Sequence, residues 1–151
     1  MKPFRFKLQT ALDLKLRQED ALKGELQRQQ EAVREKEAEL ARLRNTMADA
    51  VDNIRPHAGM PFDVEERRLF NHYWLRLKEL EARQETELQR EQSKLEEIRQ
   101  RLLEMMRDRK VMERLKEKHL ADYKKTLLRE EQKLLDEMAL NRFIGNHQYT
   151  E

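Results

Sequence analysis

The sequence contains no cysteine, only three glycines and three prolines, and 6% aromatic residues. Without cysteine there is no disulfide framework, cysteine-based zinc site or thiol redox motif. Tight turns and phosphate-binding loops depend on glycine or proline, so a fold with many connections is excluded. The three glycines also lie too far apart to form a P-loop or a dinucleotide-binding fingerprint. The sequence therefore predicts a few long elements without a nucleotide site.

Long apolar runs are also missing. No stretch approaches the roughly 18 consecutive apolar residues of a membrane span, and no apolar segment follows the basic N-terminus as in a signal peptide. We expect a soluble, cytoplasmic protein. The four histidines do not form a pair with metal-ligand spacing, and the many carboxylates lie on exposed helical faces. We therefore expect no metal, no cofactor and no enzymatic activity.

Charged residues make up 41% of the chain, with 32 basic and 30 acidic side chains and a mean hydropathy of −1.06. Such a balanced charge differs from a nucleic-acid-binding arm or an acidic tail. Helix-forming residues dominate, as they do in long helices and coiled coils. The composition thus predicts a narrow, all-α protein.

The chain has one clear interruption, where Pro56, Gly59 and Pro61 lie close together. Proline lacks the amide donor and restricts the residue before it, so no helix passes through both prolines. We predict a single elongated coiled-coil domain over residues 1–151. Its parts are a helix at about 6–54, a bend at 55–62, a second helix at about 63–143 and a flexible tail at 144–151.

A heptad repeat runs through the first predicted helix, with mostly apolar residues at two positions and charged residues or glutamine between them. One position is occupied by Leu12, Glu19, Leu26, Val33, Leu40, Met47 and Ile54, and its companion by Leu8, Lys15, Leu22, Gln29, Lys36, Leu43 and Ala50. This pattern predicts a coiled-coil seam. Because the connection between the helices is short, the sequence predicts an antiparallel hairpin.

The second predicted helix opens at Asp63, an N-cap residue with Glu66 three positions on. This helix is longer than the first and should overhang it beyond about Met112. We expect the apolar residues of that overhang to be exposed in a monomer and to favour a partner. They are Leu115, Leu120, Leu127, Leu134 and Met138.

Charge and aromatic residues are unevenly distributed. Basic residues are in excess at 1–17 and 101–129, whereas 79–97 is acidic, so a hairpin brings both basic stretches to one cationic tip. This tip is either a solvated face or a surface that docks into a protein cavity; interrupting acids and missing aromatic platforms disfavour nucleic acid. Aromatic residues gather just after the bend, either as a core cap or as a binding hot spot. That cluster comprises Phe62, Phe70, Tyr73, Trp74 and Leu75.

The chain resembles the flagellar export protein FliJ family along almost its whole length. The resemblance rests on four segments in order: the N-terminal 4–15, the segment 73–77 with its Tyr-Trp-Leu-Arg-Leu sequence, 112–118, and 130–137. The resemblance implies a stalk-like, antiparallel coiled coil of the flagellar type III secretion apparatus. Its implied partners are a hexameric export ATPase, the cytoplasmic domain of the export-gate membrane protein FlhA, and substrate chaperones, at the inner membrane but without insertion into it.

The resemblance also implies particular contact residues. The family's Tyr-x-x-x-Leu-x-x-Leu pattern places the export-gate contact at Tyr73, Leu77 and Leu80, with Trp74 beside them, although the same spacing fits the seam equally well. The implied contacts with the ATPase ring are the cations at the tip, namely Lys2, Arg5, Lys7, Arg109, Lys110, Lys116, Lys118, Lys124 and Lys125. Two other classes remain open: a generic coiled-coil scaffold that homodimerises through its overhang, and a nucleic-acid binder.

Overall fold

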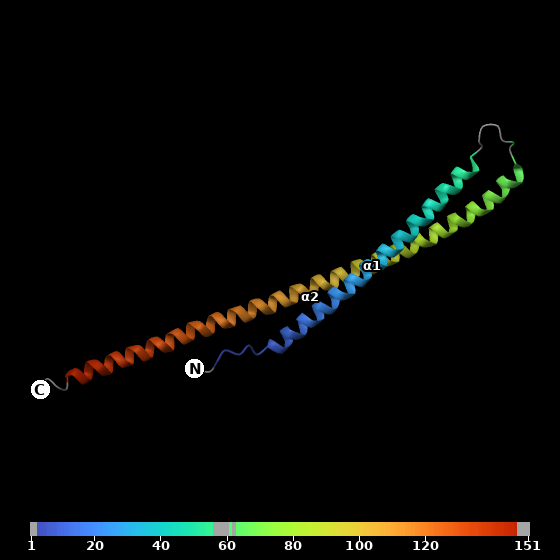
Figure 1. The fold of residues 1–151 in the computed structure, drawn as a ribbon. Coiled ribbons are helices and arrows are strands. Elements are labelled where there is room, and N and C mark those ends of the chain that lie inside the picture. Colours follow the sequence, from blue (N-terminus) through green and yellow to red (C-terminus); the bar gives the residue numbers. More distant parts are fainter. Residues whose placement is uncertain (1–2, 56–60, 62, 148–151) are drawn as a thin grey trace. The chain divides into compact units, whose positions relative to one another are not determined.

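The computed structural model describes residues 3–55, 61 and 63–147. It contains two helices, α1 (Gln9–Ile54) and α2 (Val64–His147), which pack as the predicted all-α hairpin (Figure 1). α2 continues four residues beyond the predicted end, so 144–147 is helical and does not belong to a flexible tail. The bend residues 56–60 and 62, and the rest of the tail at 148–151, lie outside the described residues.

α2 begins where its capping residue predicts. The Asp63 carboxylate accepts hydrogen bonds from the backbone amides of Glu65 and Glu66, at 2.9 and 3.4 Å. These amides have no partner within the helix, so the capping carboxylate satisfies two of the free donors of the first turn. The acidic side chains of Glu65 and Glu66 also interact favourably with the positive end of the helix dipole.

The chain forms two compact units. The first, here the terminal unit, combines Met1–Gln18 with Met105–Glu151, and the second, here the hairpin unit, is Glu19–Glu104. The prediction of one domain over 1–151 stays a prediction. Within the described residues, neither helix has an apolar stretch of the length and hydropathy needed to span a membrane.

The heptad positions within α1 form the packed seam, as predicted, whereas Leu8, also predicted for the seam, precedes the helix and is 44% exposed. Leu12, Val33, Leu40 and Met47 are among the most buried side chains of the described chain, and Glu19 at the same position is only 3% exposed. In the hairpin unit, apolar residues of α2 complete the core: Leu77, Leu95 and Ile98. Burial of these seam side chains is the main stabilising contribution, because paired helices gain more from packing than from helix propensity.

Polar contacts between the helices define the antiparallel register of the hairpin unit. The Gln29 amide donates hydrogen bonds to the Glu91 carboxylate at 2.6 Å and to its backbone carbonyl at 3.0 Å. Lys36 pairs with Glu87 at 3.2 Å. Further along the same unit, Arg44 contacts Glu81 and Arg101 contacts Glu25, each at 3.0 Å. Each exposed ion pair stabilises little, but together they disfavour a shifted register.

In the terminal unit, the residues before α1 are not helical and lie along α2. The Phe4 and Tyr123 rings are 5.6 Å apart, and the Phe6 and His119 rings 5.9 Å apart. The two contacts are two residues apart in the N-terminal segment and four residues apart in α2. Two residues of extended chain cover about 6.6 Å, and four residues of helix cover about 6 Å, so the two lengths match. Each extended residue therefore covers about twice as much of α2 as a helical residue does.

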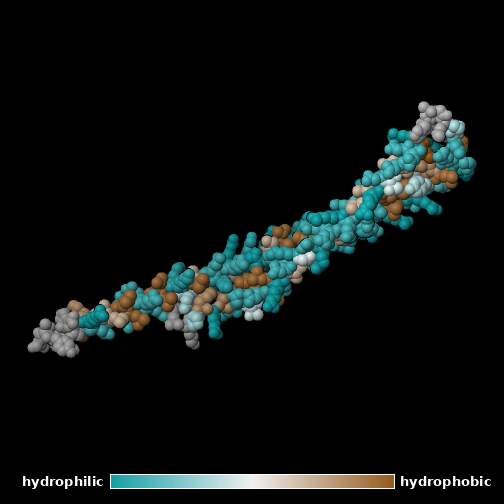
Figure 2. All heavy atoms as spheres, in the orientation of Figure 1, coloured by the Kyte–Doolittle hydropathy of each residue, from teal (hydrophilic) through white to brown (hydrophobic). Residues whose placement is uncertain are grey.

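The structure corrects the expected exposure of the overhang. Leu115, Leu120 and Leu127 are half-buried in the structure, so the prediction that they are exposed is wrong. Leu134 and Met138 are about 60% exposed, as predicted. Figure 2 shows hydrophobic side chains reaching the surface in this last part of α2. The seam-spaced leucines of α2 thus stay partly buried as far as Leu127.

Candidate interaction sites

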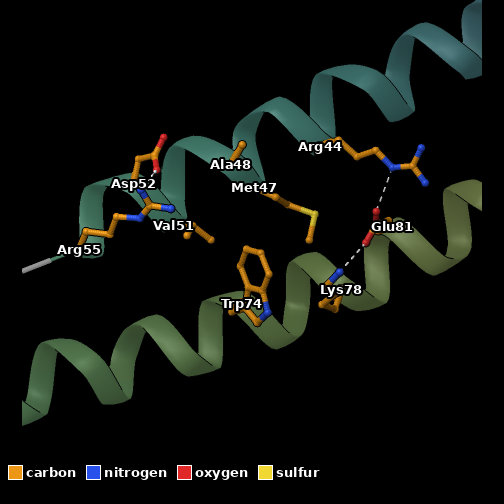
Figure 3. A pocket seen from close by; sticks show the side chains of 9 residues that line it. All are labelled: Arg44, Met47, Ala48, Val51, Asp52, Arg55, Trp74, Lys78 and Glu81. Atoms are coloured by element: carbon orange, nitrogen blue, oxygen red, sulfur yellow. Dashed lines mark hydrogen bonds and ion pairs between the residues drawn. The ribbon is translucent and has the colours of Figure 1, made fainter.

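The aromatic site of the hairpin unit lies where α1 ends and α2 begins. Leu77 is 8% exposed and packs with Leu43 and Met47, and Trp74 is half-buried against this cluster. Figure 3 shows the Trp74 ring pointing from α2 toward Met47 and Val51 of α1. The surrounding residues outline a hollow of about 340 Å³ with an apolar floor and charged walls. This arrangement suits the anchoring of one apolar side chain from a partner.

Two neighbours fix the orientation of the Trp74 ring. Phe70 stacks on it with ring centroids 5.8 Å apart, and the Lys78 ammonium lies 5.4 Å from its centroid. Both are one helical turn from Trp74, so the helix itself brings them together. Both contacts favour one orientation of the indole ring.

A charged wall borders the same hollow. The Glu81 carboxylate accepts a hydrogen bond from Arg44 Nε at 3.0 Å and lies 3.0 Å from Lys78 Nζ (Figure 3). Arg44 first, and then Lys78, lowers the pKa of Glu81 below its usual value, and Arg44 in turn has a raised pKa. Arg44 also pairs with Glu85. These side chains tie α1 to α2 beside Trp74.

The residues predicted to contact the export gate divide between two environments. Leu77 and Trp74 belong to the packed side of α2, whereas Tyr73 and Leu80 are 46% and 42% exposed. Tyr73 and Leu80 are separated by seven residues and so lie on one face, together with the exposed Leu69. The structure thus brings Tyr73 and Leu80 to the surface and leaves Leu77 beneath it.

The second site, here the basic site, is the cationic surface of the terminal unit. The sequence of this unit carries 16 basic and 10 acidic residues, a formal net charge of +6, whereas the hairpin unit carries 16 and 20, a net charge of −4. The aromatic contacts of Phe4 and Phe6, and the 2.7 Å ion pair between Lys15 and Asp108, hold the two basic stretches together. Their potentials therefore add at one surface.

Most of the predicted ring-contact cations reach this surface. Arg5, Lys7, Lys110, Lys118, Lys124 and Lys125 are exposed, and Lys116 is half-buried. Arg109 differs, because it is half-buried and pairs with Glu113 at 2.7 Å. Lys2 lies outside the described residues.

Sequence reasoning missed the role of Phe4 and Phe6 in joining the two basic stretches. Their signal was the alternation of aromatic and basic residues from 4 to 7, which is the period of an extended segment and not of a helix. As to metals, within the described parts of the chain no group of three or more histidines and carboxylates is placed to hold an ion.

The fold and these two sites define a coiled-coil hairpin protein with an aromatic site in one unit and a basic site in the other. The family model described as Flagellar FliJ protein matches residues 4–148, nearly the whole chain, and the chain belongs to this family. It is thus a protein of flagellar export, in a family of non-catalytic components of that system. No curated protein and no solved structure matches the chain.

Proposed function

We propose that the protein is a stalk-like coupling factor that links the export ATPase ring to the export gate and escorts substrate chaperones. Family membership supports a place in the flagellar export apparatus. The observation that carries the coupling role is the basic site, where two sequence-distant basic stretches meet in a unit of net charge +6. Such a surface is attracted into an acid-lined central hole of a ring.

Charge reversal tests the docking of the basic site. A variant with Lys116, Lys118, Lys124 and Lys125 changed to Glu should lose stimulation of the export ATPase while keeping its helical content. The matched control changes four exposed cations of the hairpin unit to Glu and should stimulate normally: Arg34, Arg42, Arg83 and Arg90. Equal stimulation by both variants would remove the ring contact from these lysines.

The aromatic site supports a contact with the export gate. Tyr73 and Leu80 offer exposed apolar surface, and the hollow beside Trp74 offers room for a partner side chain. In this proposal Tyr73 and Leu80 touch the gate, while Leu77 acts from the core by holding α2 in place. Function at the gate would place the protein in the cytoplasm, peripherally at the inner membrane of the flagellar base.

One observation favours a second candidate, a scaffold that pairs with its own copy. Leu134, Leu135, Met138 and Leu140 are each about 60% exposed on α2. Sedimentation of the isolated protein over a wide concentration range would detect such pairing. A dimer lost on changing Leu134 and Met138 to Lys would support the scaffold, whereas a monomer at all concentrations would exclude it.

A further inference from the structure

The outward face of α2 in the terminal unit carries a row of cations. Side chains separated by three, four or seven residues lie on the same face of a helix, and six basic residues follow this spacing over about 33 Å. All six are exposed. We name this row the basic stripe; it comprises Arg107, Lys110, Arg114, Lys118, Lys125 and Arg129.

The basic stripe lies on the side of α2 that points away from the packed seam. Two residues along a helix turn the side chain by about 200°, so Lys118 and Lys125 point about 160° away from Leu120 and Leu127. Leu120 and Leu127 are half-buried, whereas the lysines are exposed. The stripe is therefore accessible while the seam stays packed.

The stripe cations have no partner among the described residues, unlike several other cations of α2. Elsewhere on this helix, Lys78, Lys94 and Arg109 each pair with a glutamate at 2.7–3.0 Å. By contrast, the side chains of the six stripe cations make no ion pair and no hydrogen bond to any residue of the described chain. No ion pair neutralises their charge, so the stripe presents an excess of positive charge to solvent.

Apolar side chains are interleaved with these cations. Val111 precedes Lys118 by seven residues and is 66% exposed, and Leu128, beside Arg129, is 64% exposed. A phosphate backbone would engage the cations but gain nothing from these two apolar side chains. The headgroup region of a bilayer accommodates both kinds of side chain, as it does for interfacial helices.

We propose that the basic stripe adsorbs α2 onto the surface of a bilayer rich in anionic lipid. The six cations contact lipid phosphates and carboxylates along one line, and Val111 and Leu128 enter the headgroup region without crossing it. A straight row of charges meets a flat surface along its whole length, so every cation contributes. This binding goes beyond the proposed ATPase contact, with which it shares Lys110, Lys118 and Lys125.

Vesicle co-sedimentation of the full chain tests the proposal without any export component. At about 50 mM salt, the protein should bind vesicles with about 30 mol% phosphatidylserine and not pure phosphatidylcholine, and about 300 mM salt should release it. Changing Arg107, Arg114, Lys118 and Lys125 to Gln should weaken binding at least about tenfold. The matched control, with the same loss of charge in the hairpin unit, changes Arg34, Arg76, Arg83 and Arg90 to Gln and should bind nearly as the wild type.

Equal loss of binding in the two variants would overturn the proposal, because it would show a dependence on net charge alone. Failure of the wild type to bind the anionic vesicles would also overturn it. A double-stranded DNA fragment that binds more tightly than the vesicles at the same salt would assign the stripe to nucleic acid instead. Val111→Ser should weaken vesicle binding about threefold and leave DNA binding unchanged, since only a bilayer takes up the apolar side chain.

A second measurement does not depend on the multiple variants. Because the chain has no cysteine, one can be introduced for a spin label, as Ala121→Cys beside the stripe or Ala82→Cys on the exposed surface of the hairpin unit. Anionic vesicles should slow the motion of the label at 121 more than at 82. Equal effects at both sites, with normal helical content, would refute adsorption through the stripe.

Discussion

The two environments of the predicted gate-contact residues allow stability and binding to be separated by paired substitutions. In one variant the buried Leu77 becomes Ala, and in the other the exposed Tyr73 and Leu80 become Ala. The first removes a side chain that packs with Leu43 and Met47. The second removes side chains that solvent reaches over a little less than half of their surface.

The expected magnitudes follow from this packing. Leu77→Ala removes buried apolar area and leaves a void between α1 and α2, which costs about 2–3 kcal/mol of unfolding free energy. For a chain of this length that lowers the Tm by roughly 5–10 °C. The change of Tyr73 and Leu80 to Ala should cost about 0.5 kcal/mol or less for each residue, because exposed substitutions rarely destabilise more.

The assay combines thermal unfolding, followed by circular dichroism, with binding of the export-gate cytoplasmic domain well below the Tm. The Tyr73 and Leu80 variant should melt close to the wild type and lose about 2 kcal/mol or more of binding free energy, as truncated hot spots do. Leu77→Ala should melt early and bind nearly normally per folded molecule. The reverse pattern, early melting of the exposed variant or normal melting of Leu77→Ala, would refute the assignment of these residues to surface and core.

Three further outcomes are expected. Glu81 has a depressed pKa, so the stability it contributes is present above pH 4.5 and is lost as the pH falls below that value. Glu81→Gln should therefore lower the Tm at pH 7, and lower it less and less as the pH falls below 4.5. Phe6→Ala should speed amide hydrogen exchange in α1 near Leu12 while leaving the hairpin unit unchanged, because Phe6 holds the segment before α1 against His119. Gly24→Ala should raise unfolding free energy by about 0.5–1 kcal/mol, since the added methyl meets only the Arg28 side chain at 3.9 Å; a lower Tm would contradict this.

Much of the seam could be predicted from the heptad alone. Leu12, Leu40 and Met47 are buried at the positions that a period of seven requires, and even Glu19 follows the pattern despite its charge. The N-cap at Asp63 could also be predicted, because its hydrogen bonds involve only residues two and three positions away. Features of this kind are local, so the sequence determines them without reference to the rest of the chain.

The division of the candidate aromatic site could not be predicted. Tyr73, Leu77 and Leu80 have a spacing that fits both a seam and an exposed face, and only the rotation of α2 against α1 buries Leu77 and exposes the other two. That rotation is fixed by contacts between residues far apart in the sequence, such as Arg44 with Glu81. The spacing of apolar residues along one helix carries no information about its contacts with the other helix.

The sequence by itself determined that the chain is all-α, that it has one break, and that α1 carries a coiled-coil face, because these depend on composition and periodicity. Only the tertiary structure decided how the chain covers α2 in the terminal unit. There the segment with Phe4 and Phe6 is not helical and covers about twice as much of α2 per residue, and Leu115, Leu120 and Leu127 are half-buried. An extended segment rises about twice as far per residue as a helix does. The seven-residue repeat does not show which of these two conformations the first residues adopt.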